Sequence, residues 1–304
     1  MNRRYFLSRQ AMAGAALMAG TPFFGFSDRS IHQENKTFRC NYAIHDGMFA
    51  QSAGPDFIDQ IKFAHERGFR SIEDNGLMGR SVAIQDKIGS TLGALGMDMG
   101  VFVIALVPNS TVYLTTGKQE WKDKFYQKCR EAIDVAKRVN AKWMTVVPGN
   151  YDRSLPENIQ MAHVIDALRP CAELFEKEGL VMVLEPLSDT PDLFLRSSSQ
   201  TYAICRAVNS PACKILFDMY HLQKNEGNII TNIDLCWNEI AYFQIGDNPG
   251  RKEPGTGEMH YKNIFKHIHN KGFRGILGME HGNALPGREG EEALIKAYRE
   301  ADSF

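Results

Sequence analysis

Four side chains with oxygen ligand atoms stand at or near the ends of four successive apolar runs in the second half of the chain. These residues are Glu185, Asp218, Gln244 and Glu280. If the runs are parallel strands of one barrel, their carboxyl ends meet at one mouth and the four side chains converge there. Burying three carboxylates together is costly unless each is paired or bound to a metal. The pattern therefore predicts a bound cation, although any one of these residues alone could be an ordinary ion-pair partner.

The ligand types favour one hard divalent cation. Carboxylate and amide oxygens suit Mg²⁺ or Mn²⁺ and leave coordination positions open for substrate oxygens. Zinc would prefer histidine or cysteine. We therefore expect one Mg²⁺ or Mn²⁺ ion, bound by Glu185, Asp218, Gln244 and Glu280.

The elements that must position these residues are short apolar runs, which begin near Phe38. The runs are Phe38–Ile44, Ser71–Ile72, Met99–Leu106, Trp143–Val147, Val181–Leu184, Ile215–Phe217, Tyr242–Ile245 and Gly275–Met279. Most are continuous rather than alternating, which is typical of strands buried on both faces. Glu73 follows the second run, where it either faces the mouth or makes a structural ion pair.

Segments with helical spacing separate these runs. Apolar residues recur with that spacing over Lys118–Asn140 and Pro156–Glu178, and shorter helices are expected at Asp56–Arg67 and Ile264–Lys271. Alternating strands and helices predict an α/β (β/α)₈ TIM barrel, a single domain over residues 37–304. A doubly wound open sheet is the alternative, but no Gly-x-Gly-x-x-Gly follows a strand.

The N-terminal segment carries a different pattern. Arg3 and Arg4 precede Phe6-Leu7, and a modest apolar run follows over Ala11–Phe26. A charged start with a short apolar core is typical of an export signal, whereas a membrane span needs roughly 20 strongly apolar residues. The Arg-Arg-x-Phe-Leu pattern resembles a twin-arginine (Tat) signal. We predict that residues 1–30 are an export signal and linker, that the protein is periplasmic or otherwise exported, and that it has no stable membrane insertion. A cytoplasmic protein with a basic tail is the alternative.

Composition excludes some classes of protein. The 35 Lys and Arg residues and 36 Asp and Glu residues give a formal net charge of −1, so we expect no nucleic-acid partner. The six cysteines form no Cys-x-x-Cys pair, which argues against a zinc ribbon or a thioredoxin motif. We expect most of them to be small packing residues.

Several segments resemble the hydroxypyruvate isomerase branch of the xylose isomerase-like TIM barrels, the sugar phosphate isomerase/epimerase superfamily. They are Leu184–Pro186, Phe217–Asn228, Gln244–Glu258 and Gly278–Glu280. The resemblance extends from about Phe38 to the C-terminus. The run Arg-x-Glu-Pro-x-x-Gly-Glu, which begins at Arg251, is quite specific to that branch. At Gln244 the related ketose 3-epimerases usually have His.

The resemblance implies a divalent-metal isomerase that interconverts a small hydroxy-aldehyde and a hydroxy-ketone. Glu185 and Glu280 would be its catalytic residues, transferring a proton through a cis-enediolate. His221 would hydrogen-bond a substrate oxygen, and Arg251 would bind a carboxylate or hydroxyl group. A solvated His221 at the rim, and an ion pair of Arg251 with Glu253 or Glu258, are the alternatives.

Other functions stay open on the sequence. A ketose or keto-sugar 3-epimerase would use the same metal site, and a non-enzymatic periplasmic sugar-binding protein would not need the full ligand set. A related DNA-repair nuclease would need more His ligands. Lys252 and the segment His281–Asn283 depart from the family pattern near the substrate end, so the small-molecule substrate is open. The resemblance also allows a homo-oligomer.

Overall fold

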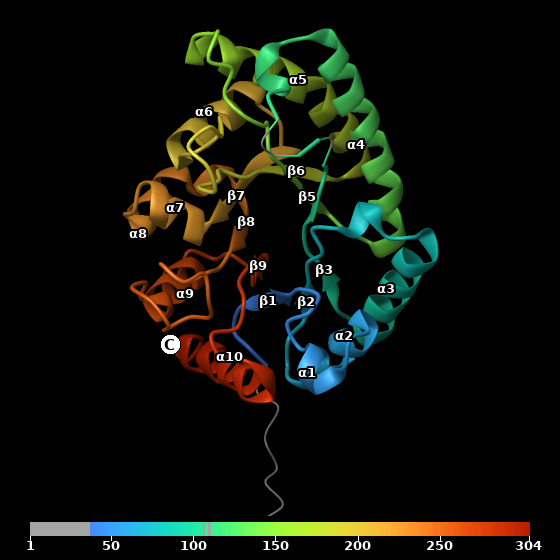
Figure 1. Cartoon of the computed structure of the whole chain (residues 1–304), viewed down its shortest axis with the longest axis vertical. Helices are drawn as coiled ribbons and strands as arrows, with labels where there is room; N and C mark the ends of the chain where they lie inside the picture. Colours follow the sequence, from blue (N-terminus) through green and yellow to red (C-terminus); the bar gives the residue numbers. More distant parts are fainter. Residues whose placement is uncertain (1–36, 106, 109–110) are drawn as a thin grey trace, which may run out of the picture. The chain divides into compact units, whose positions relative to one another are not determined.

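The fold is a parallel sheet curled into a barrel and surrounded by helices, seen in a computed structural model that describes residues 37–105, 107–108 and 111–304. Nine strands follow the order β3-β2-β1-β9-β8-β7-β6-β5-β4. Their bounds are β1 Asn41–Ile44, β2 Ser71–Ile72, β3 Asp98–Met99, β4 Phe102–Val103, β5 Trp143–Val146, β6 Val181–Leu184, β7 Cys213–Asp218, β8 Ile240–Gln244 and β9 Ile276–Gly278. In Figure 1 the strands lie at the centre and the helices surround them. The predicted TIM barrel is confirmed.

The third predicted run is split into β3 and β4, which explains why nine strands appear where eight were expected. Gly100 and Val101 lie between the two pieces. β3 pairs with β2, and β4 pairs with β5, so this one stretch of chain closes the barrel. At the break, a side chain on Gly100 would overlap the hydroxyl of Tyr242, which fills the barrel interior, so a glycine is required at this position.

Ten helices occur in the described part of the chain. Their bounds are α1 Ala50–Ala53, α2 Phe57–Glu66, α3 Val82–Leu95, α4 Gln119–Val139, α5 Glu157–Glu178, α6 Ser198–Val208, α7 Met219–Asn225, α8 Ile229–Cys236, α9 Tyr261–Asn270 and α10 Gly287–Ala301. The four predicted helices correspond to α2, α4, α5 and α9. Local chemistry sets the ends: the carboxylate of Asp56 accepts from the N–H of Ile58 at the start of α2, and Gly179 ends α5 at a φ of 68°.

Two apolar layers hold the barrel together. The inner layer fills the barrel below the mouth and consists of Ala43, Val101, Val183, Leu216, Tyr242 and Ile276. The outer layer lies between the strands and the surrounding helices and includes all six cysteines, each of them buried. This agrees with their prediction as packing residues. The filled interior leaves the polar strand ends at the mouth as the place for chemistry.

The predicted export signal, residues 1–30, lies outside the described residues and stays a prediction. Among the helices of the part that is described, none combines the length and apolar character that a membrane crossing requires.

Candidate active site

The four predicted metal ligands lie at the carboxyl ends of four neighbouring strands. Glu185 directly follows β6, Asp218 is the last residue of β7, and Gln244 is the last residue of β8. Glu280 comes two residues after β9. Because these strands pair in parallel, all four side chains reach the same end of the barrel. The structure therefore brings together the residues that the strand-end pattern singled out.

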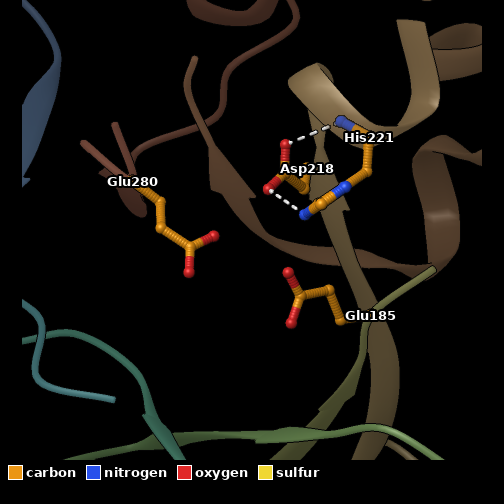
Figure 2. A group of neighbouring side chains, drawn as sticks. All are labelled: Glu185, Asp218, His221 and Glu280. Atoms are coloured by element: carbon orange, nitrogen blue, oxygen red, sulfur yellow. Dashed lines mark hydrogen bonds and ion pairs between the residues drawn. The ribbon is translucent and has the colours of Figure 1, made fainter. Parts of the chain in front are cut away.

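Three of these carboxylates and one histidine form a tight cluster. Ligand atoms of Glu185, Asp218, His221 and Glu280 all lie within 4.8 Å of one another. Figure 2 shows the carboxylates of Glu185 and Glu280 pointing into a common space beside Asp218. One small ion placed in this space could contact all three acids.

Gln244 completes this cluster and provides evidence for a cation. One end of its amide lies 3.2 Å from Oε2 of Glu280 and 3.3 Å from Oε1 of Glu185; with the oxygen at this end three acceptors meet and a cation would be needed, whereas the nitrogen there would donate to both carboxylates. In the first case its amide nitrogen donates to Oε2 of Glu73 at 3.4 Å. Oδ2 of Asp218 is also buried without a hydrogen bond. A cation among these oxygens would satisfy all of them.

The electrostatics of the acidic cluster also favour a bound cation. Burial, followed by the charges of Glu280 and Asp218, raises the pKa of Glu185 well above its usual value. Burial and the charge of Asp218 raise the pKa of Glu280 to about 7, although the guanidinium of Arg251 opposes the shift. Glu185 and Glu280 therefore hold protons more tightly than free carboxyl groups do, and a bound cation would replace those protons.

His221 lies in the site with both ring nitrogens in contact with polar groups. Nδ1 lies 2.8 Å from the hydroxyl and 3.1 Å from the backbone nitrogen of Ser188, and Nε2 lies 3.1 Å from Nη2 of Arg251. Nε2 lies 3.7 Å from Oδ2 of Asp218. Burial lowers the pKa of His221, which favours the neutral ring. His221 is thus a candidate metal ligand as well as a candidate substrate contact, and the solvated alternative is wrong because the ring is buried.

Arg251 reaches the cluster from the loop that follows β8. Its NH2 group donates to Oε2 of Glu280 at 2.9 Å and lies 3.6 Å from Oδ2 of Asp218. The same group lies 3.1 Å from Nε2 of His221. The alternative ion pairs are wrong: Glu253 accepts from the N–H of Ala284 instead. Glu258 accepts from the side-chain amide of Gln223. Arg251 is therefore placed to contact a substrate bound over the cluster.

Asp247 organises this loop, a role that the sequence did not reveal. Its buried Oδ2 accepts the N–H groups of Gly255 at 3.0 Å and Gly257 at 2.9 Å, and Oδ1 accepts that of Met259 at 3.0 Å. One carboxylate thus gathers three backbone donors from the far side of the loop. The available signal was an acid within a Gly- and Pro-rich segment, where Asp commonly bonds to nearby backbone.

The end of β2 contributes two further residues. Asn75 donates from Nδ2 to Oε1 of Glu280 at 2.8 Å, and nothing in its sequence context pointed to this role. Glu73 is buried at the mouth beside Tyr242 and Gln244. It makes none of the ion pairs found within the described residues, so the structural ion-pair alternative for Glu73 is wrong. Burial, followed by the charge of Glu280, raises the pKa of Glu73 well above its usual value.

Comparison of the chain with known proteins identifies the family to which it is similar. The model of a family described as "Xylose isomerase-like TIM barrel" matches residues 61–301. Hydroxypyruvate isomerase of Escherichia coli is 28% identical over 237 residues, which cover 74% of this chain and 88% of that protein. 2-oxo-tetronate isomerase of Pectobacterium atrosepticum is 25% identical over 230 residues, which cover 74% of this chain and 86% of that protein.

The solved structures agree on the fold. A crystal structure described as an AP endonuclease, family 2, from Brucella melitensis matches with a TM-score of 0.74, covering 86% of this chain and 98% of that one. At 19% identity this likeness concerns the fold alone. Together with the family model, the barrel and the acidic cluster at its mouth lead to one conclusion: the chain belongs to the xylose isomerase-like TIM barrel family.

Proposed function

We propose that the protein is a divalent-metal-dependent isomerase that interconverts a small hydroxy-aldehyde and a hydroxy-ketone, as hydroxypyruvate isomerases do. The observation that carries the proposal is the convergence of Glu185, Asp218 and Glu280 with the amide oxygen of Gln244. These four residues would hold one Mg²⁺ or Mn²⁺ ion. When bound, the ion would polarise the carbonyl and hydroxyl oxygens of the substrate and acidify the C–H between them.

Glu185 and Glu280 are the residues proposed to move the proton. They reach the site from β6 and β9, which lie three strands apart in the barrel, so they can approach a substrate from different sides. One carboxylate removes the proton and the other returns it to the neighbouring carbon. Glu280 is held at both oxygens, by Asn75 at Oε1 and by Arg251 at Oε2, which fixes its orientation.

His221 and Arg251 are proposed to select the substrate. Nε2 of His221 and Nη2 of Arg251 lie 3.1 Å apart, so both residues can reach one substrate carboxylate, which Arg251 would bind through its N–H groups. A small 2-oxo or hydroxy acid fits this pair of residues. The names of the two relatives support the choice, because both describe isomerases that act on such acids.

We further propose that the protein is exported through the twin-arginine pathway, on the strength of the Arg3-Arg4 pattern. Fractionation of cells that express the full chain tests this. We expect the wild-type protein in the periplasmic fraction and the double variant Arg3→Lys, Arg4→Lys only in the cytoplasmic fraction. Wild-type protein in the cytoplasmic fraction would contradict the proposal.

The experiment that tests the enzymatic proposal is exchange of substrate C–H for deuterium. The protein is incubated in D₂O with Mn²⁺ and a panel of hydroxypyruvate, 2-oxo-tetronate and ketoses, and exchange is followed by NMR. Exchange is expected to disappear with EDTA and in Glu185→Gln and Glu280→Gln. The exposed Glu173→Gln on α5 is the matched control and should exchange normally.

The labelled carbon separates the remaining alternatives. Label at the carbon next to the carbonyl with movement of the carbonyl supports an isomerase, whereas label with inversion and no movement indicates a 3-epimerase. Bound Mn²⁺ without exchange of any compound would contradict the proposed chemistry. Neither binding nor exchange would leave the sugar-binding alternative.

A further inference from the structure

Glu73 is a buried acid whose carboxylate fits beside a glycine of the neighbouring part of the barrel. The residue directly follows β2 and its side chain is buried. A side chain on Gly278, in β9, would overlap the carboxylate of Glu73, so a glycine is required at that position. A buried acid without a cationic partner is costly to the fold, which suggests that it serves the site.

The contacts of Glu73 lead to the proposed metal ligand Gln244. Oε2 of Glu73 accepts from the hydroxyl of Tyr242 at 3.2 Å and from the amide nitrogen of Gln244 at 3.4 Å. The other oxygen, Oε1, is buried and makes no hydrogen bond. With Glu73 ionised, or with a proton on Oε1, Oε2 is free to accept both contacts.

The amide of Gln244 has two orientations with opposite consequences. In one, its oxygen faces Glu185 and Glu280 and its nitrogen donates to Glu73. In the other, its nitrogen donates to Oε1 of Glu185 at 3.3 Å and Oε2 of Glu280 at 3.2 Å, which satisfies the amide better when no cation is bound, and its oxygen faces Oε2 of Glu73. An amide nitrogen offers hydrogens rather than a lone pair, so the second orientation cannot bind a cation.

We infer that Glu73 is a positioning residue, which binds no metal itself and holds the Gln244 amide with its oxygen directed into the cation site. The inference rests on the proposed function, because it concerns the same cation. The physical reason is the acceptor at Oε2 of Glu73. It stabilises the metal-ready orientation by a hydrogen bond and disfavours the turned orientation by placing two acceptors face to face.

Loss of this acceptor would lower the fraction of protein that is ready to bind metal. The apparent dissociation constant rises in inverse proportion to that fraction. Glu73→Gln is the sharpest change because its amide group can donate to the oxygen of a turned Gln244. We expect Mn²⁺ to bind this variant about 10- to 100-fold more weakly, the range usual for residues that orient metal ligands.

The test measures Mn²⁺ binding to the metal-free full chain by titration calorimetry, with thermal unfolding recorded alongside. The double variant Glu73→Gln, Gln244→Glu exchanges the two side-chain types. It keeps the total charge and a hydrogen bond between the positions, and it offers the cation a carboxylate oxygen that needs no orientation. We expect this variant to recover most of the lost affinity.

Tyr242→Phe is the matched control for a purely structural role. It removes the other hydrogen bond to the same oxygen of Glu73 but leaves the Gln244 contact in place. Lower thermal stability with unchanged Mn²⁺ affinity is expected for Tyr242→Phe.

The outcomes separate the inference from the function on which it rests. Wild-type affinity in Glu73→Gln, or a double variant no better than Glu73→Gln, would overturn the inference alone. A wild-type protein that binds no Mn²⁺ would overturn the proposed function as well. If Glu73→Gln does not fold, Glu73→Asp withdraws the carboxylate by one methylene, and wild-type affinity in that variant would again overturn the inference.

Discussion

Replacing Asp247 by asparagine tests whether one buried carboxylate holds the loop that carries Arg251. The carboxylate accepts three backbone N–H groups, those of Gly255, Gly257 and Met259. Asparagine has the same shape but keeps a single acceptor oxygen. At least one N–H would therefore face an NH₂ group, and the remaining bonds would lose their ionic character.

The magnitude follows from these bonds. A hydrogen bond to a charged group contributes about 1.5–3 kcal/mol, roughly twice as much as a neutral one. Losing one such bond and halving the other two destabilises the folded loop by roughly 3–6 kcal/mol. For a domain of this size we expect the unfolding temperature to fall by roughly 6–24 °C.

Activity should fall together with stability. Arg251 has a φ of 51°, a left-handed conformation that an arginine adopts only where its surroundings impose it. Once Asp247 no longer gathers the loop, that constraint weakens and the guanidinium leaves Glu280. The assay is thermal unfolding by circular dichroism together with kcat/KM on the best substrate of the exchange panel.

The control is Asp152→Asn, in an exposed turn where the carboxylate accepts the N–H of Ser154 at 2.9 Å. We expect this variant to unfold close to the wild-type temperature. If Asp247→Asn also unfolds there and keeps its kcat/KM, the loop does not depend on the carboxylate and the reasoning is refuted.

Three further outcomes are expected. Arg251→Lys keeps the charge but cannot contact both the backbone oxygen and Oε2 of Glu280, so kcat/KM should fall roughly 30-fold, which corresponds to about 2 kcal/mol. The affinity for Mn²⁺ should stay the same, and wild-type kinetics in this variant would contradict a role of Arg251 in substrate binding. Asn75→Ala removes the donor to Oε1 of Glu280 and should lower kcat roughly tenfold, about the loss of one hydrogen bond to a charged group, while thermal unfolding stays near wild type. The pKa of Glu280 is raised to about 7 in the fold without metal, from a usual value of 4.5, so between these pH values the folded state binds more protons than the unfolded state. The stability of the metal-free protein should therefore fall as the pH rises from 4.5 to about 7, and Mn²⁺ should reverse the loss. A flat profile without metal would show that the acids are not crowded.

The ligand cluster could be predicted because it depends on a local pattern. Each of Glu185, Asp218 and Glu280 stands at or near the end of a short apolar run, and parallel strands bring such ends to one mouth whatever the details of packing. The helices were predictable for a similar reason: apolar spacing and capping residues lie within the same segment, as they do for α5 and Gly179.

What escaped prediction depends on contacts between distant segments. The glycine required at the break in the third strand lies against Tyr242, which stands far from Gly100 in sequence. Asn75 donates to Glu280, which is 205 residues away in the sequence, and the residues around Asn75 give no indication of this contact. The role of Asp247 required the path of a long loop, which the loop's own carboxylate helps to determine.

The interrupted third strand also has a consequence for motion. The ladders that flank it are short, with two paired positions between β2 and β3 and two between β4 and β5. The β1–β2 and β8–β9 ladders are equally short, whereas β5–β6 and β7–β8 each have four paired positions. Local opening should therefore occur more readily at this seam, and amide hydrogen exchange should be faster there than in β6 and β7. Glu185 and Asp218 lie on the more slowly opening strands, while Glu73 and Asn75 follow β2 beside the seam. A brief opening at the seam would thus loosen the residues that orient Gln244 and Glu280 while Glu185 and Asp218 stay in place, giving a route for the cation to enter or leave a barrel that remains folded.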